Sequence, residues 1–472
     1  MSKAVEVRGA ARFQGAQVTV MGFGLFGGGA ATAHWLLEAG ARVTVTDLRT
    51  AEELAPALET WSRDRPAGPQ PNWVLGQHRG EDFTEADWVV ANPAVAPDHE
   101  LLVAARSAGT RVTSEMELFL ECCCAQVVLV TGTQGKSSTA HILAQMLEHA
   151  GKPVVLGGNI GRSLLRQAAE MDEDTIAVVE ISSYQLEALS ADAGARCNVR
   201  AVAITNILAD HLERHGTVEA YGQAKARVLE LLDSNGVAVV PTSLAGRAES
   251  IVMSAARIIT HGRDAADLHV AAGCFWAGDS KLGAVQDLAL PGTFQVDNTL
   301  VALGLAQELG CLPETLAASL CELLCLEFRM QPLGQINGVQ VVDNGVSTTP
   351  DSTLAALQGM VGPCTLLLGG QAKRGLAWEK LANRVTRAGV HVVAFGASRD
   401  EIQGAMTRAG AECETASDLS AATRRGLEAT PRPGTLLFSP ACASFDAYLN
   451  FRQRALCFRE LLAELETQGV GG

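Results

Sequence analysis

A lysine–serine pair follows a short apolar segment near the first third of the chain. Residues 127–130 are Val-Val-Leu-Val, and Thr131-Gly-Thr-Gln-Gly-Lys136-Ser137 comes directly after them. Apolar, mostly β-branched residues predict a buried strand of a parallel sheet, and the apolar pattern from Ala140 predicts a helix. A glycine turn between a strand and a helix points backbone N–H groups at an anion, and the helix dipole favours negative charge.

The preferred anion for such a turn is a nucleoside triphosphate. Lys136 would reach the outer phosphates, and the Ser137 hydroxyl would bind a Mg²⁺ ion. Val130 stands where the first glycine of the G-x-x-x-x-G-K-[ST] pattern belongs. An ordinary turn that ends in Gly-Lys-Ser is therefore the alternative, although the flanking strand and helix favour the triphosphate.

An acidic residue ends a later predicted strand. Residues 175–179 are mainly apolar, and Glu180 follows them. In parallel sheets the carboxyl ends of the strands carry catalytic and metal-binding groups, which favours such a role for Glu180. A helix start capped by Ser182 or Ser183 is the other interpretation, and the two can hold together.

Asp210 and His211 come shortly after a strand predicted over 201–205. An Asp-His pair by itself usually indicates a solvent-exposed loop. Three strand ends of one sheet that carry Lys-Ser, Glu and Asp-His instead favour one shared site. Lys225 falls in a helix predicted over 221–232, and because most helical lysines extend into solvent, its position alone assigns it no role.

A second glycine-rich turn opens the chain. A strand is predicted from Gln17, followed by Gly22, Gly24 and Gly27, a helix, and a second strand over 42–46 that Asp47 closes. This is the βαβ dinucleotide pattern with its acidic residue about twenty residues on. It fits an NAD dehydrogenase, a mononucleotide site in which Asp47 and Arg49 meet a base or ribose, or glycines present only for tight packing.

Composition limits the remaining classes. At 472 residues the chain is expected to form two to three domains, and 47% hydrophobic residues with a mean hydropathy of +0.14 indicate an ordered globular protein. A net charge of −15 argues against wide nucleic-acid contact. The start lacks the apolar core of a signal peptide, no run reaches membrane-spanning length, and the twelve cysteines form no C-x-x-C pair. We therefore expect a cytoplasmic protein with reduced thiols and no membrane insertion.

Taken together, the motifs resemble the Mur ligase family. The resemblance runs in colinear order over nearly the whole chain, from the N-terminal glycine turn to the last domain. The matching segments are Gly22-Phe-Gly-Leu-Phe-Gly27, residues 131–137, Gly157-Gly-Asn-Ile-Gly161, Glu180-Ile-Ser-Ser-Tyr-Gln-Leu-Glu187, residues 206–215, Tyr221 with Lys225, residues 366–373, and residues 439–451.

The resemblance implies an α/β protein of three domains. These are a Rossmann-like domain for the UDP-substrate (1–116), a P-loop-type ATPase with a mostly parallel sheet (117–325) and a Rossmann-like amino-acid domain (326–472). The branch it resembles most uses ATP to join D-glutamate to UDP-N-acetylmuramoyl-L-alanine through an acyl phosphate, in peptidoglycan precursor synthesis. A monomer is expected.

Site residues follow from the resemblance position by position. Lys136, Glu180, His211 and Lys225 are expected to be catalytic, with two Mg²⁺ ions held by Ser137, Glu180, His211 and a carbamylated Lys225. The remaining expected contacts are, for ATP, Gly132, Thr133, Gln134, Gly135, Lys136, Ser137, Ser138, Asn298, Arg329, Asp343 and Asn344; for the UDP-substrate, Leu25, Phe26, Asp47, Arg49, Asn159, Ser182 and Gln185; and for glutamate, Thr348, Lys373, Ser444 and Phe451.

Several positions depart from the family pattern. Gln134 replaces an asparagine of the phosphate loop, Phe294-Gln295 replaces His-Asn, and Phe328 replaces a histidine. Near residue 344 the family's aspartate falls on Asn344, with Asp343 one place early, and a lysine becomes Val346. The alternatives left open are ligation of L-glutamate, a non-catalytic nucleotide-binding relative, and a dehydrogenase built on the first glycine turn.

Overall fold

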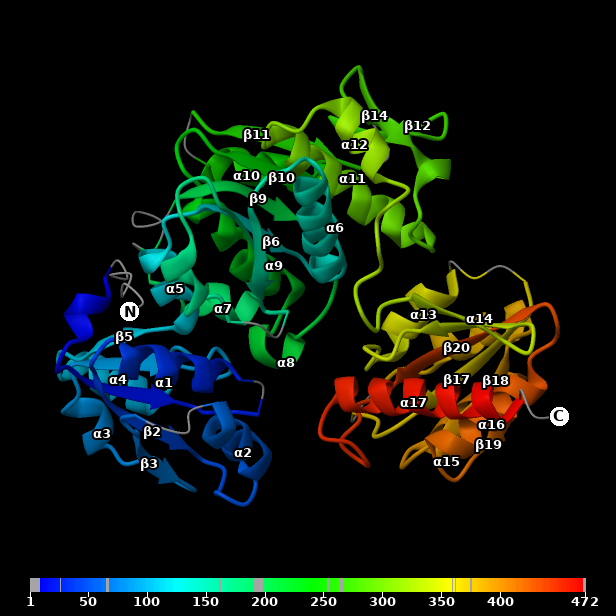
Figure 1. The fold of residues 1–472 in the computed structure, drawn as a ribbon, viewed down its shortest axis with the longest axis horizontal. Helices are drawn as coiled ribbons and strands as arrows, with labels where there is room; N and C mark the ends of the chain where they lie inside the picture. The colour runs from blue at the N-terminus through cyan, green and yellow to red at the C-terminus, as the bar shows by residue number, and fades with distance from the viewer. Residues whose placement is uncertain are drawn as a thin grey trace. The chain divides into compact units, whose positions relative to one another are not determined.

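The chain folds into three sheets with helices around them (Figure 1). The computed structural model describes residues 9–25, 27–64, 68–160, 163–190, 193, 198–252, 255–262, 266–358, 360, 362–373 and 376–469. It divides into two compact units. Unit 1 comprises Met1–Asp287 and Asp297–Glu322, and unit 2 comprises Leu288–Val296 and Leu323–Gly472.

The N-terminal sheet of unit 1 is parallel throughout and has the strand order β3-β2-β1-β4-β5. Its strands are β1 (Gln17–Met21), β2 (Arg42–Asp47), β3 (Asn72–Leu75), β4 (Trp88–Ala91) and β5 (Arg111–Thr113). The helices between and after them are α1 (Gly28–Glu38), α2 (Ala55–Asp64), α3 (Glu81–Thr84), α4 (Glu100–Ser107) and α5 (Glu115–Cys122), preceded by the short η1 (Ala10–Phe13).

The turn between β1 and α1 depends on a glycine that the sequence pattern did not single out. A Cβ atom on Gly29 would lie 2.5 Å from the carbonyl oxygens of Gly22 and Phe23. Gly27 has open space around it and needs glycine only for its φ of 86°. Gly29 is therefore the residue that lets α1 approach β1 closely.

The central sheet of unit 1 has nine strands in the order β14-β13-β12-β11-β10-β9-β6-β8-β7. The strands from β6 to β12 run parallel, and β13 and β14 are antiparallel. Their bounds are β6 (Gln126–Thr131), β7 (Val154–Gly158), β8 (Ile176–Glu180), β9 (Val199–Ile204), β10 (Val237–Pro241), β11 (Arg257–His261), β12 (Leu268–Ala271), β13 (Cys274–Ala277) and β14 (Ser280–Ala284).

Helical elements lie between and after the strands of the central sheet. The predicted helix over 221–232 begins earlier, at Val218, and tightens into a 3₁₀ helix from Arg227, whose guanidinium donates to the carbonyls of Leu186 and Leu189. The helical elements are α6 (Lys136–His149), η2 (Gln167–Glu170), α7 (Ser183–Ala188), α8 (Leu212–His215), α9 (Val218–Ala226), η4 (Arg227–Leu231), η5 (Thr242–Leu244), α10 (Ala245–Ile251), η6 (Val285–Asp287), α11 (Thr293–Glu308) and α12 (Pro313–Ser319).

Unit 2 contains a six-stranded sheet in the order β15-β16-β20-β17-β18-β19, parallel except for β15. The strands are β15 (Gln331–Ile336), β16 (Val339–Asp343), β17 (Cys364–Gly369), β18 (His391–Phe395), β19 (Cys413–Thr415) and β20 (Gly434–Ala441). The helices are α13 (Pro350–Gln358), α14 (Glu379–Ala388), α15 (Arg399–Arg408), α16 (Leu419–Ala429) and α17 (Phe451–Gly469).

The apolar pattern of the strands explains the cores. In β6 the residues from Val127 to Val130 are fully buried, as expected of a strand covered on both faces. One cluster of buried side chains joins the N-terminal and central sheets of unit 1 through residues such as Phe13 and Phe119. The predicted α/β class with mostly parallel sheets is confirmed. The boundaries at 116/117 and 325/326 stay a prediction.

Among the helices that the structure describes, none combines the length and the apolar character that a membrane crossing requires.

Gly29 gives a test of the β1–α1 contact. We expect Gly29→Ala to lower the unfolding midpoint of the protein, because its methyl group would force backbone apart at a loss of about 1–3 kcal/mol. Gly28→Ala is the matched control, since a Cβ there meets nothing within 4 Å. Differential scanning calorimetry of the two variants and the parent measures the difference, and equal midpoints would contradict the close approach.

Candidate functional site

The loop between β6 and α6 can form only with glycine at two positions. Gly132 has a φ of 142° and Gly135 a φ of 84°. A Cβ on Gly132 would collide with the hydroxyl of Thr205, and one on Gly135 with the side-chain oxygen of Asn298. The loop backbone is therefore packed against the end of β9 and against α11, where Asn298 lies beside the loop. A contact of Asn298 with ATP stays a prediction.

Two residues at the end of β9 hold this loop in place. The backbone N–H of Gln134 donates to Asn206 Oδ1 at 3.0 Å, and Asn206 Nδ2 donates back to the Gln134 carbonyl at 3.1 Å. The Thr205 hydroxyl donates to the same carbonyl at 2.6 Å. Neither residue was among the predicted ATP contacts. The available sequence signal was their place directly after a predicted apolar strand; the structure shows that this strand, β9, pairs with β6.

Lys136 and the two serines begin helix α6. Lys136 is half-buried, and its Nζ donates to the Thr133 carbonyl at 2.8 Å. Ser137 and Ser138 are buried in the first turn. The three side chains thus lie at the N-terminus of a 14-residue helix, where backbone N–H groups and the helix dipole favour an anion.

Glu180 ends β8, the strand on the other side of β6, and its side chain is 2% exposed. Asn159 Nδ2 donates to Glu180 Oε1 at 2.7 Å. The second oxygen, Oε2, is buried and has no hydrogen-bond partner among the residues that the structure describes. A buried carboxylate oxygen without a donor is unfavourable, so this atom calls for a proton, a cation or a bound ligand group.

Lys225 lies in α9 with its side chain buried, and its Nζ is 4.5 Å from the centre of the Tyr221 ring. Burial and, second to it, the neighbouring Lys136 lower the pKa of Lys225 to about 7, although Asp210 and Glu180 oppose the shift. The predicted residues Lys136, Glu180 and Lys225 are therefore brought within electrostatic range of one another.

His211 is placed differently. It is the residue before α8, with a left-handed backbone at φ 50°, and its ring is 43% exposed. Its Nδ1 is 3.3 Å from the Tyr184 hydroxyl, and its Nε2 is 3.6 Å from an oxygen of Asp210. Its Nδ1 is also 3.5 Å from an oxygen of Glu213, and its ring centre is 6.1 Å from that of Tyr221. Among the contacts of the described residues, none joins His211 to Glu180. A left-handed backbone in a residue other than glycine is strained and is often found at functional sites.

The donors offered to a metal at this edge are few. Within the described ranges, no three His, Cys, Asp or Glu side chains are close enough to form a metal site by themselves. A protein cage for Zn²⁺ or Ca²⁺ is therefore not formed by these side chains. The unpartnered Oε2 of Glu180 and the Ser137 hydroxyl instead fit Mg²⁺, which keeps waters and substrate phosphates as ligands.

A cavity of about 250 Å³ in unit 1 collects several predicted UDP-substrate residues. Asn159, Ser182 and Gln185 line it together with the glycine turn at Gly22. Asn92 and Tyr184 also line it and were not predicted. The Asn92 side chain packs against Gly22, a contact that joins the ends of two parallel strands and has no local sequence signal.

Two of the predicted UDP-substrate residues also have a structural function. Ser182 caps α7: the Gln185 N–H donates to its hydroxyl at 3.2 Å, and Ser182 N–H donates to Gln185 Oε1 at 2.9 Å. The predicted N-cap of this helix is therefore confirmed for Ser182.

Asp47, a predicted UDP-substrate residue of the N-terminal sheet, also has a structural function. The Asp47 carboxylate accepts from the N–H groups of Gly24 at 3.0 Å and Arg49 at 2.9 Å, so it fixes the glycine turn. The Arg49 side chain is exposed and Leu25 is half-buried. Phe26 lies outside the described residues.

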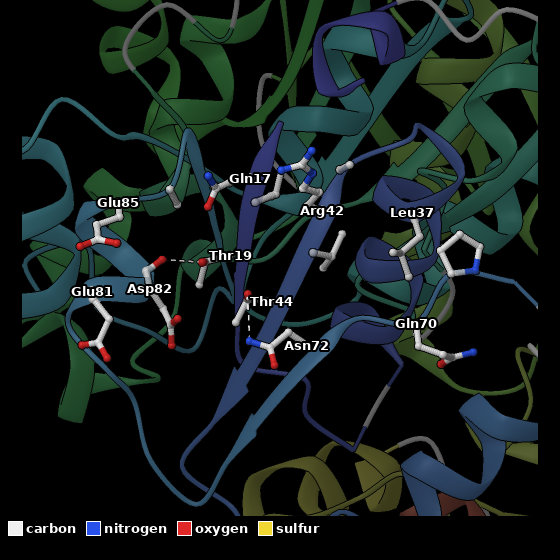
Figure 2. Close-up of a pocket in the computed structure, with 15 residues that line it drawn as sticks. Gln17, Thr19, Leu37, Arg42, Thr44, Gln70, Asn72, Glu81, Asp82 and Glu85 are labelled. Carbon is white, nitrogen blue, oxygen red and sulfur yellow. Dashed lines mark hydrogen bonds between the residues drawn. The ribbon is translucent and has the colours of Figure 1, made fainter. Parts of the chain in front are cut away.

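Another cavity, of about 490 Å³, lies beside the N-terminal sheet (Figure 2). Thr19 and Thr44 point into it from neighbouring strands, and α3 contributes Glu81 and Asp82. None of the predicted site residues lines it. It begins at the amino ends of β1 and β2, whereas ligands of open α/β sheets bind at the carboxyl ends. It is therefore not the candidate site.

In unit 2 the predicted ATP contacts take part in internal interactions. Asp343 is fully buried; its oxygens accept from Gly345 N–H at 2.9 Å and from Arg459 Nε at 2.8 Å. Asn344 donates to the Ser439 hydroxyl at 2.9 Å. Arg329 is half-buried. Nucleotide binding by these three residues stays a prediction.

The predicted glutamate contacts lie on three loops of unit 2 and at the start of α17. Lys373 is exposed, Thr348 half-buried, Ser444 buried, and Phe451 begins α17. Fully buried Arg454 ties these loops together: its guanidinium donates to the carbonyls of Gly369 at 3.1 Å, Ala443 at 3.2 Å and Gly345 at 3.4 Å. Burial lowers the pKa of Arg454 to about 10. In the sequence it resembles any arginine of a charged surface helix, so no pattern identified it.

Comparison with known proteins matches both segments of unit 1. Residues 16–114 match the MurD-like N-terminal domain of Mur ligases, and residues 130–306 match the Mur ligase middle domain. A protein of Roseiflexus sp. (strain RS-1), named UDP-N-acetylmuramoylalanine--D-glutamate ligase, is 32% identical over 467 residues, which cover 95% of this chain and 98% of the relative. A protein of the same name from Geotalea uraniireducens (strain Rf4) is 31% identical over 465 residues, with 95% and 97% covered.

Solved structures share the fold. UDP-N-acetylmuramate-alanine ligase from Thermotoga maritima superposes with a TM-score of 0.61 at 18% identity, covering 95% of this chain and 99% of its own. The MurF ligase of Thermotoga maritima, solved in complex with ADP, gives a TM-score of 0.58 at 16% identity, with 99% and 100% covered. Both likenesses extend over nearly all of each chain.

The Asn206 contacts predict how rigid the loop is. We expect Asn206→Ala to speed amide hydrogen exchange of residues 132–135 by about 30-fold, because two hydrogen bonds to the loop are lost, each contributing about 1 kcal/mol. Asn235→Ala, in the exposed turn before β10, is the control. Exchange followed by mass spectrometry measures both, and unchanged protection in Asn206→Ala would mean that β9 does not hold the loop.

Proposed function

This chain belongs to the Mur ligase family, and from that premise we propose that it joins D-glutamate to UDP-N-acetylmuramoyl-L-alanine with consumption of ATP. It is then an acid–amino-acid ligase of peptidoglycan precursor synthesis. Relatives that carry this name match the chain over nearly its whole length. The observation that carries the proposal lies at the carboxyl ends of β6 and β8, where a glycine phosphate loop and a buried carboxylate follow adjacent strands and the buried lysine of α9 lies within electrostatic range of both.

The chemistry requires activation of the substrate carboxylate, because a bare carboxylate is a poor acyl donor. Transfer of the ATP γ-phosphoryl group gives an acyl phosphate and ADP. The amine of glutamate then attacks the acyl carbon, the C–O bond to phosphate breaks, and the amide forms with loss of the amine proton. In this scheme Lys136 and the N–H groups of residues 132–138 hold the phosphates and stabilise the charge on the phosphoryl group during transfer.

The same proposal includes two Mg²⁺ ions. Ser137 and Glu180 would hold the ion bound to ATP, and Glu180, His211 and a modified Lys225 the second. The buried, unpartnered Oε2 of Glu180 supports this arrangement. Bound there, the ions would neutralise negative charge on the phosphoryl group. The chain's own residues would orient the phosphates and exclude water from the acyl phosphate.

Lys225 would act as a carbamate. An ammonium beside Lys136 and two Mg²⁺ ions would be repelled, whereas a carbamate carries negative charge and binds metal. Because the pKa of Lys225 is lowered to about 7, the amine is mostly neutral at pH 8 and can react with CO₂. Below pH 7 it is protonated and unreactive, so the carbamate is lost as pH falls through that value.

The amino-acid pocket is proposed from Thr348, Lys373, Ser444 and Phe451. A glutamate dianion needs cationic and N–H partners, since an unpaired charge in a closed site costs several kcal/mol. Lys373 supplies one positive charge, and the family's second lysine is Val346 here. The D enantiomer is favoured by the names of the relatives. The three-domain division, a monomeric state and a cytoplasmic location remain parts of the proposal.

Phosphate release tests the function directly. With ATP, Mg²⁺ and UDP-N-acetylmuramoyl-L-alanine, we expect release with D-glutamate and little with L-glutamate. Lys136→Ala should lose at least about a hundredfold in turnover, the usual effect of removing a donor to developing charge. Lys281→Ala, an exposed lysine of β14, is the control and should keep parental turnover. Release with L-glutamate alone would reassign the amino acid, and none with either would indicate a non-catalytic relative.

The carbamate has its own test. We expect Lys225→Ala to be inactive and partly rescued by short carboxylates such as formate. The parent supplied with ¹³C-bicarbonate should give a ¹³C NMR carbamate signal at pH 8 that fades by pH 6, following the lowered pKa of Lys225. Lys225→Ala should lack the signal and Lys281→Ala should retain it. A fully active, metal-loaded parent without the signal would refute the modification.

A further inference from the structure

Both carboxylate oxygens of Glu187 contact side chains of one short helix, α8. Its Oε1 is 3.2 Å from His215 Nδ1, and its Oε2 accepts from Arg214 Nε at 3.1 Å. Glu187 belongs to α7, and both partners belong to α8. His215 Nε2 is in addition 3.1 Å from the Ser183 hydroxyl of α7. Three polar contacts thus join two helices that are far apart in the sequence.

These two helices carry the two ends of the proposed metal site. Helix α7 begins at Ser183, directly after Glu180 and its cap, and α8 begins directly after His211. The helices have six and four residues, which is too short to be stable without tertiary contacts. The strained backbone of His211 needs support of the same kind. Both helices pack against α9, which supplies part of this support. The polar contacts between α7 and α8 add a direct link between the segment that carries Glu180 and the one that carries His211.

The arrangement Ser183–His215–Glu187 resembles a nucleophile, a base and an orienting acid, but it is closed. Ser183 is 3% exposed, and the His215 side chain is 1% exposed. Because a carboxylate only accepts hydrogen bonds, His215 Nδ1 donates to Glu187, and in the neutral ring Nε2 accepts from Ser183. A substrate cannot reach this hydroxyl. The group therefore orders the structure and does not react.

Arg214 extends the same contact to the N-terminal sheet and to His211. Its guanidinium donates to the carbonyls of Ala94 at 3.2 Å and Val95 at 3.3 Å, in the loop after β4. It also lies 5.0 Å from the centre of the Tyr184 ring, and the Tyr184 hydroxyl is 3.3 Å from His211 Nδ1. By orienting Arg214, Glu187 acts on the aromatic ring that contacts His211.

We propose that Glu187 is a positioning residue for metal binding, which clamps α8 onto α7 so that His211 is held in place relative to Glu180. This rests on the proposed function, in which Glu180 and His211 bind Mg²⁺. Glu187 itself touches neither residue in the described contacts. Its carboxylate faces Arg214 and His215, and its role is to make two short helices behave as one rigid support.

Binding of Mn²⁺ in place of Mg²⁺ tests the clamp without turnover. With full-length protein and a non-hydrolysable ATP analogue, electron paramagnetic resonance counts free and bound Mn²⁺. We expect Glu187→Ala to weaken Mn²⁺ binding by about 10- to 100-fold, the usual effect of losing a partner behind the metal ligands. Glu187→Gln keeps one acceptor for two donors and should fall between. Glu230→Ala is the control: its carboxylate is 3.8 Å from Arg227, lines the same surface hollow as Glu187, and is 54% exposed.

The outcomes separate the two proposals. Unchanged Mn²⁺ affinity in a folded Glu187→Ala, judged by circular dichroism, would overturn the clamp even if the parent ligates glutamate. If that variant does not fold, parental affinity in Glu187→Gln overturns it. Weakened Mn²⁺ binding in a protein that releases no phosphate with either glutamate would leave the clamp standing and reject the ligation. A parent that binds no Mn²⁺ would reject both.

Discussion

Two buried charges beside the phosphate loop constrain the central sheet. Glu180 has a carboxylate oxygen without a partner, and the ammonium of Lys225 is buried beside Lys136. Groups of this kind are costly to bury, and a fold whose net stability is about 5–15 kcal/mol can retain few of them. Glu180 lies at the carboxyl end of β8, and Lys225 lies on helix α9. Ligands bound at this end of the sheet can supply the missing partners. The proposed metal ions and phosphates would do so.

The rest of the site is an arrangement of backbone around these charges. Because Gly132 and Gly135 have no side chains, the end of β9 and helix α11 can pack directly against the loop. Asn206 forms a hydrogen bond with a loop residue 72 positions earlier in the chain. In unit 2 one arginine, Arg454, orders three loops in a comparable way. In both units the groups that fix a loop are supplied by a different strand or helix. The loops are therefore only as well ordered as the sheet beneath them.

Much of this protein could be predicted from its sequence. β-branched runs gave the buried strands, because a strand covered on both faces must be apolar throughout. The glycine turns and the Lys136-Ser137 pair indicated two sites for anions, because only glycine permits the backbone of these turns. A helix cap at Ser182 or Ser183 was predicted from the serines after Glu180, and the structure places it at Ser182. Each of these features depends on neighbours within a few residues, so the local pattern contains them.

Tertiary structure alone decided what the local pattern left open. Lys225 looked like a solvated helical lysine, and only its burial next to Lys136 lowers its pKa. Gly29, and not Gly27, makes the close approach of α1 to β1. Arg454 became a core residue, and Glu187 a link between α7 and α8. These properties arise where segments distant in the chain meet, and a single sequence does not record which segments those are, since burial and charge pairing are set by the packing of the whole unit.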